Sequence, residues 1–201
     1  FSALTISKSL PNNRGTVIVK HANPCGVSIN KSKVKSYQLA LACDPISAFG
    51  GIVSCNFKIN KSLAIELNKN FLEVVIAKGF ETSALKILKK KKNLRIIDAT
   101  KFIIKEVTRN SSVNETILVQ TEDLKKFKTK DFKIVSKIKP NKHQLKNLIF
   151  AFNICRYVKS NAIVLTSQDS TVGIGSGRPS RLDSCEIAIN KMKTFQSIRG
   201  A

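Results

Sequence analysis

One stretch near the start of the chain constrains the fold more than any other. Residues 16–20 form an apolar, β-branched run, which is typical of a buried strand. The run ends at Lys20 and His21, and Pro24 and Gly26 follow closely. Because proline fixes φ and glycine permits a positive φ, we expect a loop directly after the strand. Open α/β sheets build their sites in this way, at the carboxyl ends of strands.

Lys20 and His21 place two titratable groups at the end of this strand. Histidine suits general-base work because its ordinary pKa, about 6.5, lies near neutrality. The adjacent ammonium of Lys20 disfavours the imidazolium and is expected to keep His21 able to accept a proton. Lys20 also offers a positive charge for a developing anion or a phosphate. The alternative is that His21 merely caps a loop and Lys20 is solvated.

The rest of the chain alternates between strand and helix patterns. Residues 1–15 are polar and contain Pro11 and Gly15, so we expect a connecting segment there. Helices are expected over residues 33–43, 61–70, 81–91, 140–159 and 180–194, and strands over 50–55, 72–77, 94–97, 102–104, 116–120, 162–166 and 171–174. This order predicts a layered α/β domain, and the sequence contains no visible internal repeat.

The chain is strongly basic, with 35 lysines and arginines, 13 acidic residues and a formal charge of +22. A basic nucleic-acid-binding module is therefore one alternative. The basic residues are mostly scattered lysines, however, and the chain has no Trp and two Tyr with which to stack bases. The densest run, residues 89–92, follows a predicted helix and complements its dipole. We expect a solvated basic surface and no nucleic-acid partner.

The five cysteines are odd in number and irregularly spaced, which indicates reduced thiols and a cytoplasmic protein. His21, Pro24 and Cys25 superficially match the H-x-E and P-C-x-x-C pattern of zinc deaminases. Asn23 replaces the catalytic glutamate, and no second cysteine follows at the required spacing, so we expect no zinc or other metal site. No apolar run is long enough to cross a bilayer, and no signal peptide is visible, so no membrane association is expected.

Five blocks along the chain carry a resemblance to a known family. Residues 20–27 read KHANPCGV, 43–53 read CDPISAFGGIV, 73–80 read EVVIAKGF, 159–164 read KSNAIV and 171–181 read TVGIGSGRPSR. In the same order, these blocks are similar to KHANPCGVA, CDPVSAFGGII, EVIIAPGF, KSNAIV and TVGIGAGQMSR of the AICAR transformylase domain of the bifunctional purine biosynthesis proteins. The blocks together cover nearly the whole chain.

The resemblance implies formyl transfer from the co-substrate 10-formyltetrahydrofolate to the 5-amino group of AICAR, giving FAICAR and tetrahydrofolate in purine biosynthesis. By the family pattern His21 is the proton acceptor, Lys20 the transition-state stabiliser, and Asn161 holds the substrate and transition state. The AICAR-binding positions of the family fall on Gly50, Glu73, Asn161 and Arg181, and a folate-contacting position falls on Leu182. Glu73 stands where some relatives carry Asp, which keeps the carboxylate.

The resemblance also implies an α/β/α fold, cytidine-deaminase-like without zinc, and a homodimer that carries IMP cyclohydrolase as well. We expect a connecting segment at 1–15, a first α/β subdomain at 16–110 and the start of a second at 111–201. The family's RYGENPHQ and ASDAFFPF blocks are absent and the chain begins with Phe1, so we expect a fragment that is inactive or weak alone. A deaminase-like nucleotide enzyme of the same fold is a further alternative.

Overall fold

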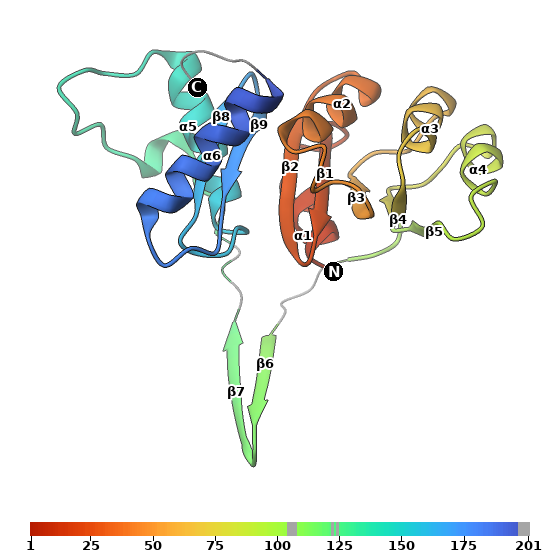
Figure 1. Ribbon diagram of the computed structural model, residues 1–201, viewed down its shortest axis with the longest axis horizontal. Coiled ribbons are helices and arrows are strands. Elements are labelled where there is room, and N and C mark those ends of the chain that lie inside the picture. The colour runs from red at the N-terminus through yellow and green to blue at the C-terminus, as the bar shows by residue number, and fades with distance from the viewer. Residues whose placement is uncertain (104–107, 122, 124, 197–201) are drawn as a thin grey trace.

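A seven-stranded sheet forms the centre of the computed structural model, which describes residues 1–103, 108–121, 123 and 125–196 (Figure 1). The order of its strands is β5-β4-β3-β1-β2-β9-β8. β3, β4 and β5 run parallel, whereas β1 runs antiparallel to β2 and β3. The strands are β1 (Gly15–Lys20), β2 (Asn23–Ile29), β3 (Gly51–Cys55), β4 (Leu72–Ala77), β5 (Arg95–Asp98), β8 (Ile163–Ser167) and β9 (Ser170–Gly175).

Helices cover both faces of this sheet and confirm the predicted three-layer α/β/α arrangement. On one face α2, α3 and α4 pack in a row and α6 lies beside α2, while α1 and α5 pack on the other face. The helices are α1 (Ser2–Ser9), α2 (Lys33–Cys43), α3 (Lys61–Asn68), α4 (Thr82–Leu88), α5 (Lys142–Cys155) and α6 (Arg181–Phe195). Within the described ranges, no helix has the length and apolar character needed to span a bilayer. The likeness to cytidine deaminases stays a prediction.

Strand β1 alternates its side chains between the two cores. Val17 and Val19 pack with residues of α1 and α5, whereas Ile18 packs with residues of α2, α3 and α4. All three side chains are buried. Because the strand is covered on both faces, its apolar run is continuous rather than alternating. The strand predicted over residues 16–20 is therefore confirmed.

Two predictions about the first 29 residues are wrong. Residues 1–15, expected as a connecting segment, contain helix α1, whose Ala3 and Ile6 are buried in the core. Apolar side chains at helical spacing within this polar stretch explain the helix. The loop expected after Lys20 is also wrong, because His21 and Ala22 alone make the turn and the chain re-enters the sheet as β2.

The turn between β1 and β2 is as short as a hairpin turn can be. Lys20 pairs directly with Asn23, and the φ angles of His21 and Ala22 are 50° and 61°. Positive φ at both central residues matches the twist of the flanking strands. Pro24 is tolerated in β2 because it lies where the register with β1 shifts, at an irregularity of the ladder.

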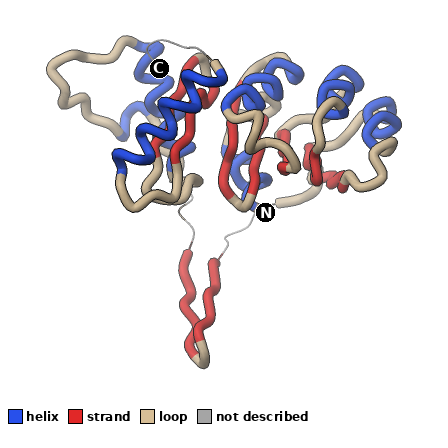
Figure 2. Tube along the Cα trace, in the orientation of Figure 1, coloured by secondary structure: helices blue, strands red, loops and turns tan. Residues whose placement is uncertain are grey.

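A separate two-stranded hairpin, β6 (Thr108–Val113) and β7 (Thr116–Thr121), projects away from the main sheet (Figures 1 and 2). The strand predicted over 116–120 is confirmed, but residues 110–112, expected to separate two strands, lie inside β6. Residues 102 and 103 are not in a strand, and residue 104 lies outside the described residues. The subdomain boundary near residue 110 stays a prediction, and strands from both sides of it belong to one sheet.

The order helix, hairpin, helix occurs twice, as α1-β1-β2-α2 and as α5-β8-β9-α6. The second hairpin also turns through two non-glycine residues with positive φ, Gln168 and Asp169. In both units a glycine of the second strand faces the backbone of the second helix: Gly26 faces Ala40, and Gly175 faces Ser184. The two units repeat in structure, whereas the sequence contains no visible internal repeat.

We predict that Gly26→Ala and Gly175→Ala each destabilise the fold by about 3 kcal/mol or more, because the added methyl overlaps a helix carbonyl oxygen. Urea unfolding measures the loss. Gly177→Ala is the control: its φ is 69° but no atom lies within 4 Å of the added carbon. Its cost is the left-handed backbone alone, about 1 kcal/mol. Equal losses in all three variants would contradict the packing argument.

Candidate functional site

One edge of the main sheet collects the predicted catalytic pair and two of the predicted substrate-binding residues. Lys20 and His21 end β1, Gly50 immediately precedes β3, and Glu73 is the second residue of β4. Because β1 is antiparallel to β3 and β3 is parallel to β4, the end of β1 lies beside the starts of β3 and β4. Residues from three separate segments therefore meet at this edge.

The remaining predicted residues lie at the same edge, on the other side of β2. β2 and β9 are antiparallel, so the start of β2 lies beside the end of β9. Asn161 precedes β8, the neighbour of β9, and Arg181 and Leu182 begin the helix that follows β9. The sheet thus brings the two groups of predicted residues to one edge.

The side chain of Asn23 connects these two groups of residues by hydrogen bonds. Its Nδ2 donates to Ser176 Oγ at 3.0 Å, and its Oδ1 accepts from the backbone N–H of Lys159 at 3.0 Å. The bond to Ser176 spans 153 positions of the chain. Asn23 has no role by residue type alone; the signal that points to it is its place two residues after His21, at the start of a strand.

Lys20 is held by a backbone carbonyl, and no acid among the described residues forms an ion pair with it. Its Nζ donates to Phe49 O at 2.7 Å, and the side chain is half-buried. The side chain of His21 is exposed at the hairpin turn. The pair therefore offers a fixed cation beside an imidazole that a substrate can reach. The catalytic roles of the two residues stay predictions.

Gly50 and Glu73 are neighbours in space. The φ of Gly50 is 68°, in the left-handed region that favours glycine. A side-chain carbon at this position would lie 3.4 Å from the ring of Phe71 and 3.7 Å from Oε1 of Glu73. Glu73 is exposed although it belongs to a largely buried strand, so its carboxylate faces solvent and needs no buried partner.

Asn161 uses its amide nitrogen within the protein. Nδ2 donates to the carbonyl oxygens of Arg178 and Pro179, at 3.0 and 2.6 Å. The backbone carbonyl of Asn161 accepts from Ser184 Oγ at 2.9 Å. The side chain therefore shapes the loop at 178–179, and the donor hydrogens of its amide are already engaged. Oδ1 is the atom through which it can accept a hydrogen bond from a substrate.

The start of α6 is capped by the protein itself. Ser180 Oγ accepts from the backbone N–H groups of Leu182 and Asp183, at 3.1 and 3.5 Å. These N–H groups are therefore less available to an anion than the free N–H groups of an uncapped helix N-terminus. Arg181 is exposed in the first turn, and Leu182 is 68% exposed. A guanidinium and an apolar side chain thus stand free at this end of the site.

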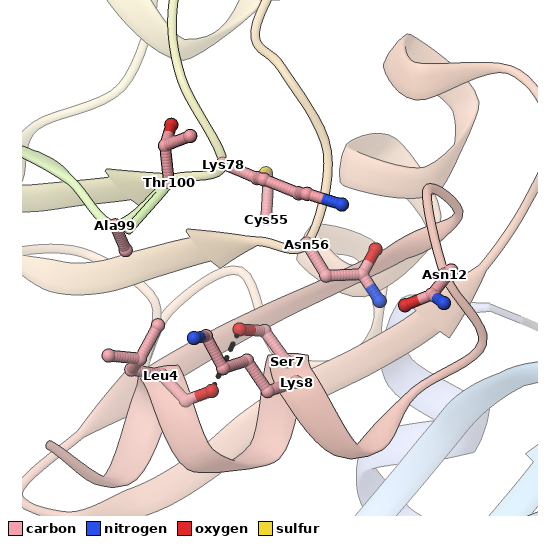
Figure 3. A pocket seen from close by; sticks show the side chains of 9 residues that line it. All are labelled: Leu4, Ser7, Lys8, Asn12, Cys55, Asn56, Lys78, Ala99 and Thr100. Carbon is pink, nitrogen blue, oxygen red and sulfur yellow. Dashed lines mark hydrogen bonds between the residues drawn. The ribbon is translucent and has the colours of Figure 1, made fainter. Parts of the chain in front are cut away.

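Two cavities among the described residues are lined by side chains other than those of Lys20 and His21. The larger, about 690 Å³, reaches the site through Ala22 and Lys159. The smaller, about 220 Å³, lies at the opposite edge of the sheet, where Lys8 and Lys78 point toward it (Figure 3). His21, Glu73 and Arg181 are exposed at this edge of the sheet, where a substrate can reach them.

The described residues include no group of three or more His, Cys, Asp or Glu side chains that could hold a metal ion. Cys25, in the motif that resembles a zinc deaminase, is buried, and burial raises the pKa of its thiol to about 11. It is a neutral thiol at physiological pH and a poor nucleophile.

A family model and several curated proteins match this chain, and all of them carry descriptions of the same bifunctional enzyme. The family model described as AICARFT/IMPCHase bienzyme matches residues 2–191. The "Bifunctional purine biosynthesis protein PurH" of Leptospira biflexa is 41% identical over 100% of this chain and 39% of its own length. The proteins with the same description from Rhodospirillum rubrum and Aquifex aeolicus are 45% and 40% identical, over 85% and 96% of this chain and 33% and 38% of their own lengths.

The chain thus spans between a third and two fifths of the length of these curated relatives. The match extends over both groups of predicted site residues, on either side of β2. It lends no support to a nucleic-acid-binding module.

We predict that Asn23→Ala weakens the connection between the two groups of site residues and lowers the free energy of unfolding by about 0.5–1.5 kcal/mol, because the exposed N–H of Lys159 exchanges its protein acceptor for water. Hydrogen exchange at Lys159 becomes faster in this variant. Asn23→Asp is the matched control: it keeps an acceptor for Lys159, and the hydroxyl of Ser176 can donate to it. Unchanged exchange in Asn23→Ala would show that the connection does not depend on this side chain.

Proposed function

Because this chain belongs to the AICARFT/IMPCHase bienzyme family, we propose that it supplies the central part of a site that transfers a formyl group to AICAR. The formyl donor is 10-formyltetrahydrofolate, and the products are FAICAR and tetrahydrofolate. The observation that carries the proposal is the gathering of Lys20, His21, Glu73, Asn161 and Arg181 at one edge of the sheet.

The chemistry of the acceptor explains why such a site needs a base. The 5-amino group of AICAR is a weak nucleophile because its lone pair delocalises into the imidazole carboxamide. It must be held close to the formyl carbon and lose a proton as the new C–N bond forms. The bond between the formyl carbon and N10 of the folate breaks, and N10 takes up one proton, so the number of protons is unchanged.

In this proposal His21 takes the proton from the amine, since its ring is exposed at the end of β1. Lys20 supplies a positive charge next to His21 as negative charge develops on the formyl oxygen. The hydrogen bond to Phe49 O limits where the ammonium of Lys20 can lie. A cation that is positioned before the reaction stabilises the transition state without a cost of reorganisation.

The other predicted residues bind the substrates. The carboxylate of Glu73 and Oδ1 of Asn161 accept hydrogen bonds from donors of AICAR, and Gly50 leaves space for it beside Glu73. Arg181 binds an anionic part of the substrate, and Leu182 offers apolar contact to the folate. Two acceptors, a guanidinium and an exposed apolar side chain suit a polar anion and a partly aromatic co-substrate.

We infer that the complete protein also carries IMP cyclohydrolase, acts in the cytoplasm and forms a homodimer. The odd number and irregular spacing of the five cysteines favour a reducing compartment. Sedimentation of the complete protein is expected to give the mass of two chains. The mass of one chain at micromolar concentration would contradict the dimer.

We predict that His21→Ala lowers kcat of the complete protein about 10²–10⁴-fold, the usual effect of losing a general base. The KM for AICAR changes much less, because the exposed imidazole makes few ground-state contacts. The assay follows release of tetrahydrofolate from 10-formyltetrahydrofolate in the presence of AICAR.

His143→Ala is the matched control, since His143 is the second of the two histidines and is exposed in the first turn of α5. Its kcat is expected to equal that of the unsubstituted protein. Normal turnover by His21→Ala would refute the assigned base, and equal losses in both variants would refute a role specific to His21.

A further inference from the structure

Asp44 and Lys191 form an ion pair whose carboxylate is buried. Lys191 Nζ lies 2.6 Å from Asp44 Oδ2, and the side chains are 33% and 4% exposed. Oδ2 has no hydrogen bond from any other described residue, so the ammonium of Lys191 is what compensates its charge. A buried carboxylate without such compensation is costly. The lysines of the other ion pairs between described residues are 61% and 65% exposed.

Asp44 also begins the turn that leads into β3. Its Oδ1 accepts from the N–H of Ser47 at 2.9 Å, and its backbone carbonyl accepts from the N–H of Ala48 at 3.1 Å. Burial alone would raise the pKa of Asp44, but hydrogen bonds from Lys191 and Ser47 outweigh burial and lower the pKa. The carboxylate is therefore charged at neutral pH, and both of its oxygens have a structural partner.

The turn that starts at Asp44 ends at the candidate site. Ala48 O accepts from the N–H of Gly51 at 3.0 Å, and Phe49 O accepts from Lys20 Nζ at 2.7 Å. The position of Phe49 O, and hence of the Lys20 ammonium, depends on the turn that Asp44 anchors. Gly50 belongs to the same turn. The ion pair of Asp44 and Lys191 therefore helps to position two residues of the site, Lys20 and Gly50.

Lys191 connects the same turn to the other half of the site. It lies in α6, the helix that begins with Arg181 and Leu182. A helix is a stiff rod with a rise of about 1.5 Å per residue, so fixing Lys191 limits the position of Arg181 as well. α6 also packs closely on β9, where Gly173 and Gly175 face its backbone.

We propose that Asp44 and Lys191 are positioning residues that clamp α6 to the turn at 44–50. The clamp keeps Lys20 and Gly50 on one side, and Arg181 on the other, directed at the same substrate. Neither residue of the pair touches the reacting atoms. The inference rests on the proposed formyl transfer, and it assigns a role to Asp44, which lies in the block at 43–53 and is not among the predicted substrate-binding positions.

The test uses Lys191→Met in the complete protein, with kcat and KM measured by formyl transfer. We expect kcat to fall about tenfold or more, and Lys191→Arg, which keeps the cation, to recover most of it. Lys146→Met is the matched control, because it removes a surface ion pair with Asp169 and is expected to leave kcat unchanged. Circular dichroism and the thermal midpoint establish that each variant is folded.

The double variant D44N/K191M separates positioning from stability. It leaves no buried charge, and the amide side chain introduced at position 44 keeps an acceptor for the N–H of Ser47, so the variant is expected to fold even if Lys191→Met does not. A clamp predicts that the double variant stays slow although its thermal midpoint recovers. Recovery of both kcat and the midpoint, or normal kcat in folded Lys191→Met, would overturn the proposal.

A second readout does not depend on the reaction. Hydrogen exchange at the amides of Ala48 and Gly51 is expected to become at least tenfold faster in Lys191→Met and to stay unchanged in Lys146→Met. If the unsubstituted protein transferred no formyl group, the proposed function would fail while faster exchange would still support the clamp. Unchanged exchange in Lys191→Met would overturn the clamp whatever the activity.

Discussion

The two-residue turn between β1 and β2 is the constraint on which the candidate site depends. It holds His21 and Ala22 at positive φ, where non-glycine residues cost about 1 kcal/mol each. Burial of Val17, Ile18 and Val19 on both faces of the sheet outweighs this cost, since each contributes roughly 1.5–3 kcal/mol. A strongly buried hairpin can therefore hold an exposed histidine in a disfavoured conformation at a fixed place.

The pairing of β2 with β9 also explains why distant segments meet. Because β2 runs antiparallel to β9, its first residue, Asn23, lies beside the end of β9, where it bonds to Lys159 and Ser176. The two helix-hairpin-helix units lie side by side in one sheet. In each unit, a glycine of the second strand packs against the backbone of the second helix. The candidate site lies at the junction of the units rather than within either of them.

Electrostatics is organised locally in a chain that is strongly basic overall. The formal charge of +22 is spread over exposed lysines, which individually contribute little to stability. At the site, by contrast, one cation is held by a carbonyl oxygen and another compensates a buried carboxylate. The few charges with fixed positions, rather than the total charge, are what a mechanism can use.

The sequence by itself determined the layered α/β class, the helices at 33–43 and 180–194, and the identity of the candidate residues. Hydrophobic periodicity is local, so it can be recognised along the chain, and a family resemblance compares residues one position at a time. Composition misled in three places: the polar stretch that hides α1, Pro24, which suggested a loop where β2 begins, and the polar residues 110–112, which lie inside β6.

Only the tertiary structure decided which residues face one another. The connection made by Asn23, the carbonyl that holds Lys20 and the pairing of Asp44 with Lys191 all join residues far apart in sequence. The order of strands in the sheet sets these contacts, and no local pattern encodes that order. Residue types could therefore suggest the chemistry of the site, whereas its geometry required the fold.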